Sequence, residues 1–315
     1  MTAACAVFLL ALTSSSLGAP QDLQQRWEEW QVKHGRRYSS QGEEEGRRRA
    51  WQVNQDWVKG HKNRGDADLS MEMNQFADGT QPRRQLLHPS AHSPTVDILH
   101  NNMSPDNDVS PTRPKSFDWR SKGVISPVNN EDQFGNNFAV VDRGCVESFQ
   151  AIKTGNLVGL STWEIVDCCP LAEDDFFDCI HNLGGLCSAN AYPLYTGQCR
   201  NNTCQAVGMI QGGKAVPAGQ LDQMVDALLE RPLAVLIDSS AASFERYQSG
   251  IYNDTDCSRT EVGHAMQVVG YGEEDGQEFW ICKNTWGNTW GDQGYVRMKK
   301  GADTCGIESH ASYPY

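Results

Sequence analysis

Residues 131–150, EDQFGNNFAVVDRGCVESFQ, constrain the fold more than any other stretch of the chain. The apolar residues in and just after this stretch recur every three or four positions, as in a helix with one buried side: Phe138, Val141, Cys145, Phe149 and Ile152. Asn136 and Asn137 supply a helix start signal, and Gly155 supplies a stop signal. Enzymes place reactive thiols at such a helix start, because its free N–H groups stabilise negative charge.

The run from residue 125 to 141, ISPVNNEDQFGNNFAVV, resembles the nucleophile segment of papain-like cysteine proteases, the cathepsin L group in particular. The resemblance implies that Glu131 stands at the position of the oxyanion-hole glutamine and Asn137 at that of the catalytic cysteine. It also implies that Phe134 replaces a disulfide half-cystine and that Phe138 replaces a tryptophan.

Two later motifs extend the resemblance. VGHAMQVVGYG, residues 262–272, is similar to the strand that carries the catalytic histidine, which implies that His264 holds the position of the base. FWICKNTWGNTWGDQGYVRM, residues 279–298, is similar to the segment of the orienting asparagine. Asn284 then matches that asparagine, and Trp286 matches the indole that covers it.

This family implies an α+β fold in which a helical left domain packs against a β-barrel right domain. The chain's own pattern agrees, because the helix near residue 137 comes first and alternating strands such as HAMQVVGYG follow later. His264 is then expected to face Asn137 across the cleft between the two halves. Without the resemblance, a histidine in an apolar strand is more often a satisfied core residue than a catalytic one, and the matching flanks of His264 and Asn284 reverse that expectation. Asn284 could equally be a turn residue.

The chain divides into four segments. Residues 1–18 hold an apolar run followed by small residues and predict a signal peptide, with a buried first helix as the alternative. Residues 20–82 predict a helical unit that resembles the ERFNIN-type propeptide of the family, followed by MEMNQFADGT. Residues 83–113 predict a linker, either a processing site or a flexible tether, and 114–315 the peptidase-like domain.

The signal peptide places the protein in the secretory pathway, and leaves extracellular and lysosomal destinations both open. No second apolar run is long enough to span a bilayer, so no membrane span is expected. Three sequons, at Asn102, Asn201 and Asn253, are compatible with that route.

Ten of the eleven cysteines follow the signal peptide, an even number that suits disulfides in an oxidising compartment. The resemblance implies Cys257 with Cys305, and Cys168 with either Cys199 or Cys204. Cys145 and Cys282 lie on apolar patterns and are expected to be free and buried. No partner follows from the sequence for a remaining set of three cysteines: Cys169, Cys179 and Cys187.

The net charge of the chain limits the classes of binding partner that are expected. Residues 114–315 contain 14 Lys plus Arg and 26 Asp plus Glu, so this region carries −12 of the chain's −13. Such acidity disfavours nucleic acid and anionic membranes as partners. No paired CxxC spacing of a zinc site occurs, so neither a metal nor another cofactor is expected.

A papain-type site needs an ionisable thiol, a histidine base, an orienting asparagine and donors for an oxyanion. Here His264 and Asn284 are present, whereas Asn137 offers a carboxamide and Glu131 an acceptor. We therefore expect an inactive, monomeric papain-fold protein that binds peptides or proteases through its cleft or propeptide. One alternative is a hydrolase that uses an unrecognised nucleophile or a hydrolytic water held between Glu131 and His264. Another alternative is a storage or structural protein.

Overall fold

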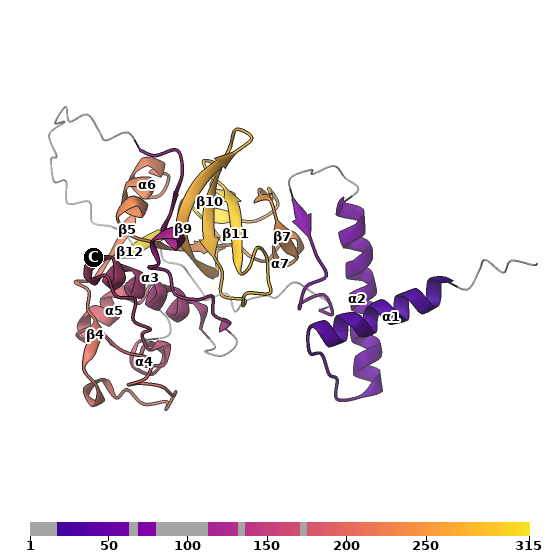
Figure 1. Ribbon diagram of the computed structural model, residues 1–315, viewed down its shortest axis with the longest axis horizontal. Helices are drawn as coiled ribbons and strands as arrows, with labels where there is room; N and C mark the ends of the chain where they lie inside the picture. Colours follow the sequence, from indigo (N-terminus) through magenta and orange to yellow (C-terminus); the bar gives the residue numbers. More distant parts are fainter. Residues whose placement is uncertain (1–17, 63–68, 80–112, 132–135, 171–174) are drawn as a thin grey trace, which may run out of the picture.

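The structure, a computed structural model, describes residues 18–62, 69–79, 113–131, 136–170 and 175–315. Figure 1 shows a crossed pair of helices, a twisted β-sheet and a helical half around α3, with the sheet between the other two parts. Most of the expected signal peptide and linker, together with Phe134, lies outside the described residues. No helix within those residues is long and apolar enough to cross a bilayer.

The N-terminal part consists of α1 (Gly18–Lys33), α2 (Gln41–Lys62) and the short strand β1 (Ser70–Met71). Three indole rings hold the two helices together: Trp27 stacks on Trp30 at 5.3 Å between centroids and meets Trp51 edge-on at 5.5 Å. Aromatic pairs at these separations add to the gain from burying their area. The two helices are present where the sequence predicts a helical unit, and β1 pairs with the distant strand β7 (Tyr247–Ser249).

Helix α3 (Asn137–Thr154) is the helix that the sequence predicted, with both ends where the signals lie. The Asn136 side chain accepts a hydrogen bond from the Ala139 N–H, which satisfies one of the free donors of the first turn. Gly155 ends the helix at φ 75°, a left-handed conformation that glycine adopts without steric cost. The α3 stripe packs into a core with residues from neighbouring elements, among them Leu160, Ile165 and Leu186.

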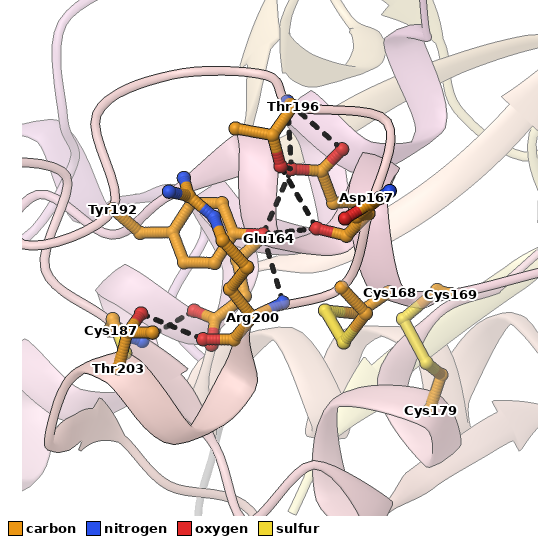
Figure 2. Close-up of a disulfide and its surroundings, with 12 residues drawn as sticks. Glu164, Asp167, Cys168, Cys169, Cys179, Cys187, Tyr192, Thr196, Arg200 and Thr203 are labelled. Atoms are coloured by element: carbon orange, nitrogen blue, oxygen red, sulfur yellow. Dashed lines mark hydrogen bonds between the residues drawn. A yellow bond between two sulfur atoms is a disulfide. The ribbon is translucent and has the colours of Figure 1, made fainter.

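Short elements surround α3 in the helical half: α4 (Thr162–Cys168), α5 (Phe177–Asn182), β3 (Leu186–Cys187), η3 (Asn201–Thr203) and β4 (Ala206–Gly208). Disulfides and the carboxylates of Glu164 and Asp167 connect these elements (Figure 2). Asp167 accepts hydrogen bonds from the Tyr192 hydroxyl at 2.9 Å and from the Gly197 N–H at 2.7 Å. The chain after α5 is therefore tied back to the end of α4.

Four disulfides join eight of the cysteines in the described residues: Cys168–Cys199, Cys169–Cys179, Cys187–Cys204 and Cys257–Cys305. The expected Cys257–Cys305 bridge is confirmed, and of the two partners considered for Cys168 the structure shows Cys199. Cys145 and Cys282 are free and buried, as predicted. The adjacent Cys168 and Cys169 enter different bridges, so the end of α4 is joined both to the loop that holds Cys199 and to helix α5 through Cys179. Figure 2 shows the second of these bridges.

The β half is one eight-stranded sheet in which seven strands follow the order β5-β12-β6-β9-β10-β11-β8 and β2 pairs with β9. Its strands are β2 (Phe117–Asp118), β5 (Gly213–Val216), β6 (Leu233–Ile237), β8 (Ile251–Tyr252), β9 (His264–Glu274), β10 (Gln277–Lys283), β11 (Tyr295–Lys299) and β12 (Ala311–Pro314). Short helices lie beside them: η1 (Trp119–Lys122), α6 (Leu221–Glu230), α7 (Ala242–Glu245) and η4 (Thr304–Gly306). The first nine residues of β9 are buried, so this strand runs through the core.

Candidate functional site

Three elements bring the predicted site residues together. Asn137 opens α3, His264 opens β9, and Asn284 follows the end of β10. Asn137 Nδ2 lies 2.9 Å from His264 Nδ1, and His264 Nε2 lies 2.6 Å from Asn284 Oδ1. The first contact joins residues 127 positions apart in sequence, and together the two contacts place the imidazole between the asparagines with no exposed surface.

The hydrogen-bond pattern fixes where the histidine carries its proton. Asn137 Nδ2 is a donor only, and it donates both to the Ala265 carbonyl at 3.1 Å and to His264 Nδ1. His264 Nδ1 must therefore present its lone pair, and the ring proton sits on Nε2, which donates to Asn284 Oδ1. In this arrangement His264 Nδ1 already accepts a hydrogen bond from Asn137.

Glu131 lies beside this trio, held by the two residues that follow Asn284 in sequence. Its carboxylate accepts a hydrogen bond from Trp286 Nε1 at 3.1 Å and another from the Thr285 hydroxyl. Its own N–H donates to the Thr285 carbonyl at 2.7 Å. The Trp286 ring lies 4.9 Å from the His264 ring. The residues that the resemblance assigned to one site are thus contiguous in space.

A buried charge cluster lies against the same helix, and sequence reasoning missed it. Arg143 and Glu147, one turn apart on α3, form an ion pair at 3.2 Å. Glu147 also accepts from the Leu160 N–H at 2.8 Å, and its charge acts on the buried Lys283. The i, i+4 spacing of opposite charges on a largely buried helix was the available signal.

Comparison with known protein families follows the same division of the chain. Residues 113–315 match the family model "Papain family cysteine protease", and residues 27–82 match "Cathepsin propeptide inhibitor domain (I29)".

The chain belongs to the papain family.

Papain-family relatives align along almost the whole chain. Cathepsin K of Mus musculus is 33% identical over 97% of this chain and 97% of its own length. Procathepsin L of Mus musculus is 33% identical over 98% of this chain and 97% of its own length. Among solved structures, a recombinant stem bromelain precursor has a TM-score of 0.80 at 29% identity, covering 93% of this chain and 98% of its own. Procathepsin L 3 from the larval midgut of Tenebrio molitor has a TM-score of 0.75 at 29% identity, with the same coverages. The predicted papain-like α+β fold with a propeptide is confirmed.

The free thiols of this papain-family chain lie away from any accessible surface. Cys145 and Cys282, the two free cysteines in the described residues, have no exposed surface. Burial raises the pKa of both thiols, and the nearby Asp142 carboxyl raises that of Cys145 further. Neither thiol is therefore suited to act as a nucleophile. Among the described residues, the Glu164 carboxylate lies close to the sulfurs of Cys187 and Cys204, the kind of cluster that can bind a metal ion. The two sulfurs, however, are bonded to each other in a disulfide.

The buried charge cluster of Arg143, Glu147 and Lys283 predicts that the folded protein becomes more stable as the pH rises above neutral. Burial lowers the pKa of Lys283 from 10.5 to about 8, although the Glu147 carboxylate partly opposes this shift. Between these two values the unfolded chain binds the extra proton, so the free energy of unfolding should increase as pH rises from about 8 to 10. Below the folded pKa both states are protonated and the cost of burying the charge is constant.

Urea unfolding at several pH values tests this expectation. The Lys283→Met variant keeps the length of the side chain and removes the titrating group, so its stability curve should lack the rise seen in the unmodified chain. Parallel curves for the two proteins would contradict the assignment, because tyrosine ionisation is common to both.

Proposed function

We propose that this protein is a catalytically inactive papain-family homologue that binds peptides or proteases without cutting them. The observation that supports it most directly is the hydrogen bond from Asn137 Nδ2 to His264 Nδ1. In the family's reaction that nitrogen takes a proton from the nucleophile. Here it accepts from a group that has no acidic proton to give and no electron pair suited to attack.

The surroundings of Glu131 act in the same direction. An oxyanion hole needs donors aimed at the oxygen on which negative charge develops. Glu131 contributes a carboxylate, and this carboxylate takes hydrogen bonds from Trp286 and Thr285. A negative charge near a developing oxyanion raises the barrier, and loss of a single oxyanion donor commonly costs about 10² to 10³ in rate. Nucleophile and oxyanion positions are therefore both unsuited to acyl transfer.

A hydrolase with an unrecognised nucleophile is the competing interpretation, and the wild-type chain can test it. An epoxide probe directed at thiols should label no residue, and a broad fluorogenic peptide panel should show no turnover at acid or neutral pH. His264→Ala is the matched variant for any signal that does appear. Turnover by the unmodified chain that disappears in His264→Ala would contradict the proposal.

Passage through an oxidising compartment is part of the proposed function. Four disulfides in the described residues support this route, since such bonds persist in secretory compartments and are rare in the cytosol. We propose a monomer that is exported or delivered to the lysosome. Abundant accumulation without saturable binding of peptides or proteases would instead favour a storage role.

One sequon is well placed for an N-linked glycan. Asn253 is exposed just after β8, and its side-chain oxygen accepts from the Thr304 hydroxyl at 3.5 Å, which directs the amide nitrogen elsewhere. We expect glycosidase treatment of the secreted chain to reduce its mass, and Asn253→Gln or Thr255→Ala to remove that part of the shift. Thr255→Ser preserves the sequon and should retain the glycan. If glycosidase treatment reduces the mass of Asn253→Gln and of Thr255→Ala as much as that of the unmodified chain, the glycan is attached to another asparagine.

A further inference from the structure

One cluster of metal-ligand atoms in the helical half takes no part in the candidate site. The Glu164 carboxylate, Cys187 Sγ and Cys204 Sγ each offer one ligand atom, and these atoms all lie within 4.8 Å of one another. Within the described residues, no other set of three cysteine, histidine or carboxylate side chains is this close. A disulfide joins Cys187 to Cys204, so the two sulfurs cannot act as thiolate ligands while it persists. The cluster therefore combines a metal-ligand set with a reducible bond.

Main-chain contacts hold Glu164 and Cys187 together independently of the disulfide. Glu164 lies in the first turn of α4, and its Oε2 accepts a hydrogen bond from the Cys187 N–H at 2.7 Å (Figure 2). The Cys187 carbonyl accepts from the Ser161 N–H at 3.0 Å. Strand β3, which ends at Cys187, also pairs with β4. Opening the disulfide therefore leaves the carboxylate and one of the two sulfurs in place.

Cys204 is the ligand that can adjust its position. It directly follows η3 and is partly exposed, whereas Glu164 and Cys187 are each 1% exposed. Zinc binds thiolate sulfur at about 2.3 Å and carboxylate oxygen at about 2.0 to 2.2 Å in a tetrahedron, so its ligand atoms lie about 3.5 to 3.8 Å apart. Bonded sulfurs are closer than this, and rotation of the Cys204 side chain after reduction can separate them.

The buried carboxylate favours a cation at this point. Burial raises the pKa of Glu164, and the hydrogen bond from the Cys187 N–H partly opposes this shift. Among the residues that the structure describes, no lysine, arginine or histidine forms an ion pair with Glu164. A bound divalent cation would stabilise the ionised carboxylate and, beside it, two thiolates.

We propose that a dithiol reductant converts this disulfide into a zinc site made of Cys187, Cys204 and Glu164. One thiolate of the dithiol attacks Cys204 Sγ, and the S–S bond breaks with its electron pair on Cys187 Sγ. The second thiol of the reductant then displaces Cys204, so the reductant leaves as a disulfide. Two electrons and two protons pass to the cysteines. Zinc binding releases the two thiol protons, and a water molecule completes the tetrahedron.

The zinc site replaces a covalent link by a metal link under reducing conditions. The end of β3 and the chain after η3 are joined by a sulfur–sulfur bond in one state and by a sulfur–zinc–sulfur bridge in the other. Within the described residues, the other three disulfides belong to no such ligand group, so their reduction yields thiols alone. The inference is independent of the proposed function, because Asn137, His264 and Asn284 play no part in it.

Zinc binding by the full-length chain before and after reduction tests the proposal. Tris(2-carboxyethyl)phosphine replaces the dithiol because it reduces disulfides without adding thiol ligands, and gel filtration removes its excess before zinc is added. The reduced chain should bind one zinc ion more than the oxidised chain. X-ray absorption at the zinc edge should show two sulfur ligands at about 2.3 Å and two oxygen ligands at about 2.0 Å. Equal zinc content before and after reduction, or a shell of four sulfurs, overturns the proposal.

Matched variants assign the ligands. Cys187→Ser/Cys204→Ser should lose the additional zinc ion, whereas Cys168→Ser/Cys199→Ser removes another bridge of the same half and should retain it. Glu164→Gln keeps an oxygen for the Cys187 N–H but removes the charge, and should bind zinc at least about tenfold more weakly. Three results would overturn the proposal: zinc retained by the first variant, zinc lost from a folded second variant, or unchanged affinity in Glu164→Gln.

Alkylation covers the case in which reduction loosens the fold. Iodoacetamide is added to the reduced chain with and without zinc, and mass spectrometry maps the modified cysteines. Zinc should slow the modification of Cys187 and Cys204 at least about tenfold and leave that of Cys168 and Cys199 unchanged. Equal protection of all four cysteines, or protection of none, overturns the proposal. A zinc-bound chain that is unfolded by far-ultraviolet circular dichroism also overturns it.

Discussion

The Asn137→Cys/Glu131→Gln variant is expected to cleave fluorogenic peptides, whereas the wild-type chain is expected to leave them intact. The first change places a thiol where the carboxamide now donates to His264 Nδ1, and so frees the imidazole to take a proton. The second replaces a carboxylate by an amide that can donate to an oxyanion. Asn284 already accepts from His264 Nε2 at 2.6 Å, so the ring needs no further orientation.

The single variants Asn137→Cys and Glu131→Gln are expected to cleave peptides more slowly than the double variant. Asn137→Cys alone should be slower than the double variant by about 10² to 10³, the usual cost of one lost oxyanion donor. Glu131→Gln alone should remain inactive, and Asn137→Ala in the Glu131→Gln background is the matched control that opens the site without supplying sulfur. A thiol-directed epoxide should label only the variants that carry the Asn137→Cys change. An active Ala control would contradict the nucleophile assignment.

Glu147→Gln is expected to destabilise the fold by about 3 to 5 kcal/mol, the usual effect of removing one partner of a buried ion pair. The glutamine keeps an oxygen for the Leu160 N–H but removes the charge that faces Arg143 and Lys283. Both cations are buried, so water cannot compensate them.

Urea unfolding measures this loss, and Glu230→Gln provides the control. Glu230 pairs with Arg231 on the surface, where its side chain is 66% exposed, so its removal should cost only about 0 to 1 kcal/mol. A loss below about 1 kcal/mol for Glu147→Gln would show that the buried cluster contributes little net stability.

Local signals in the sequence predicted the elements whose formation depends on neighbouring residues. The ends of α3 were predictable because Asn136 caps its own helix and Gly155 adopts a left-handed turn, and neither depends on distant contacts. The site trio and the Cys257–Cys305 bridge followed from the family resemblance, which carries long-range information that periodicity lacks.

Other features depend on pairs that no local pattern specifies. The pairing of β1 with β7 joins residues that lie far apart in the sequence, and nothing in the helical periodicity of the N-terminal part indicates it. The bridges Cys169–Cys179 and Cys187–Cys204 contain the three cysteines for which neither the residue pattern nor the resemblance implied a partner: Cys169, Cys179 and Cys187. The hydrogen bonds of Glu131 required the positions of Trp286 and Thr285, which only the folded chain provides.

Next to β1, the Glu72 N–H donates to the Arg246 carbonyl at 3.0 Å, and Asn74 Nδ2 donates to the Glu245 carbonyl at 2.6 Å. The acceptors are peptide carbonyls, and this has a consequence for how this contact surface changes during evolution. A substitution at position 245 or 246 alters a side chain but leaves the oxygen that accepts the hydrogen bond in place. Substitutions of the side chains at these two positions therefore leave in place the acceptors that hold the N-terminal part. Selection can therefore change the side chains of the site and of positions 245 and 246 while the pairing with the N-terminal part is retained.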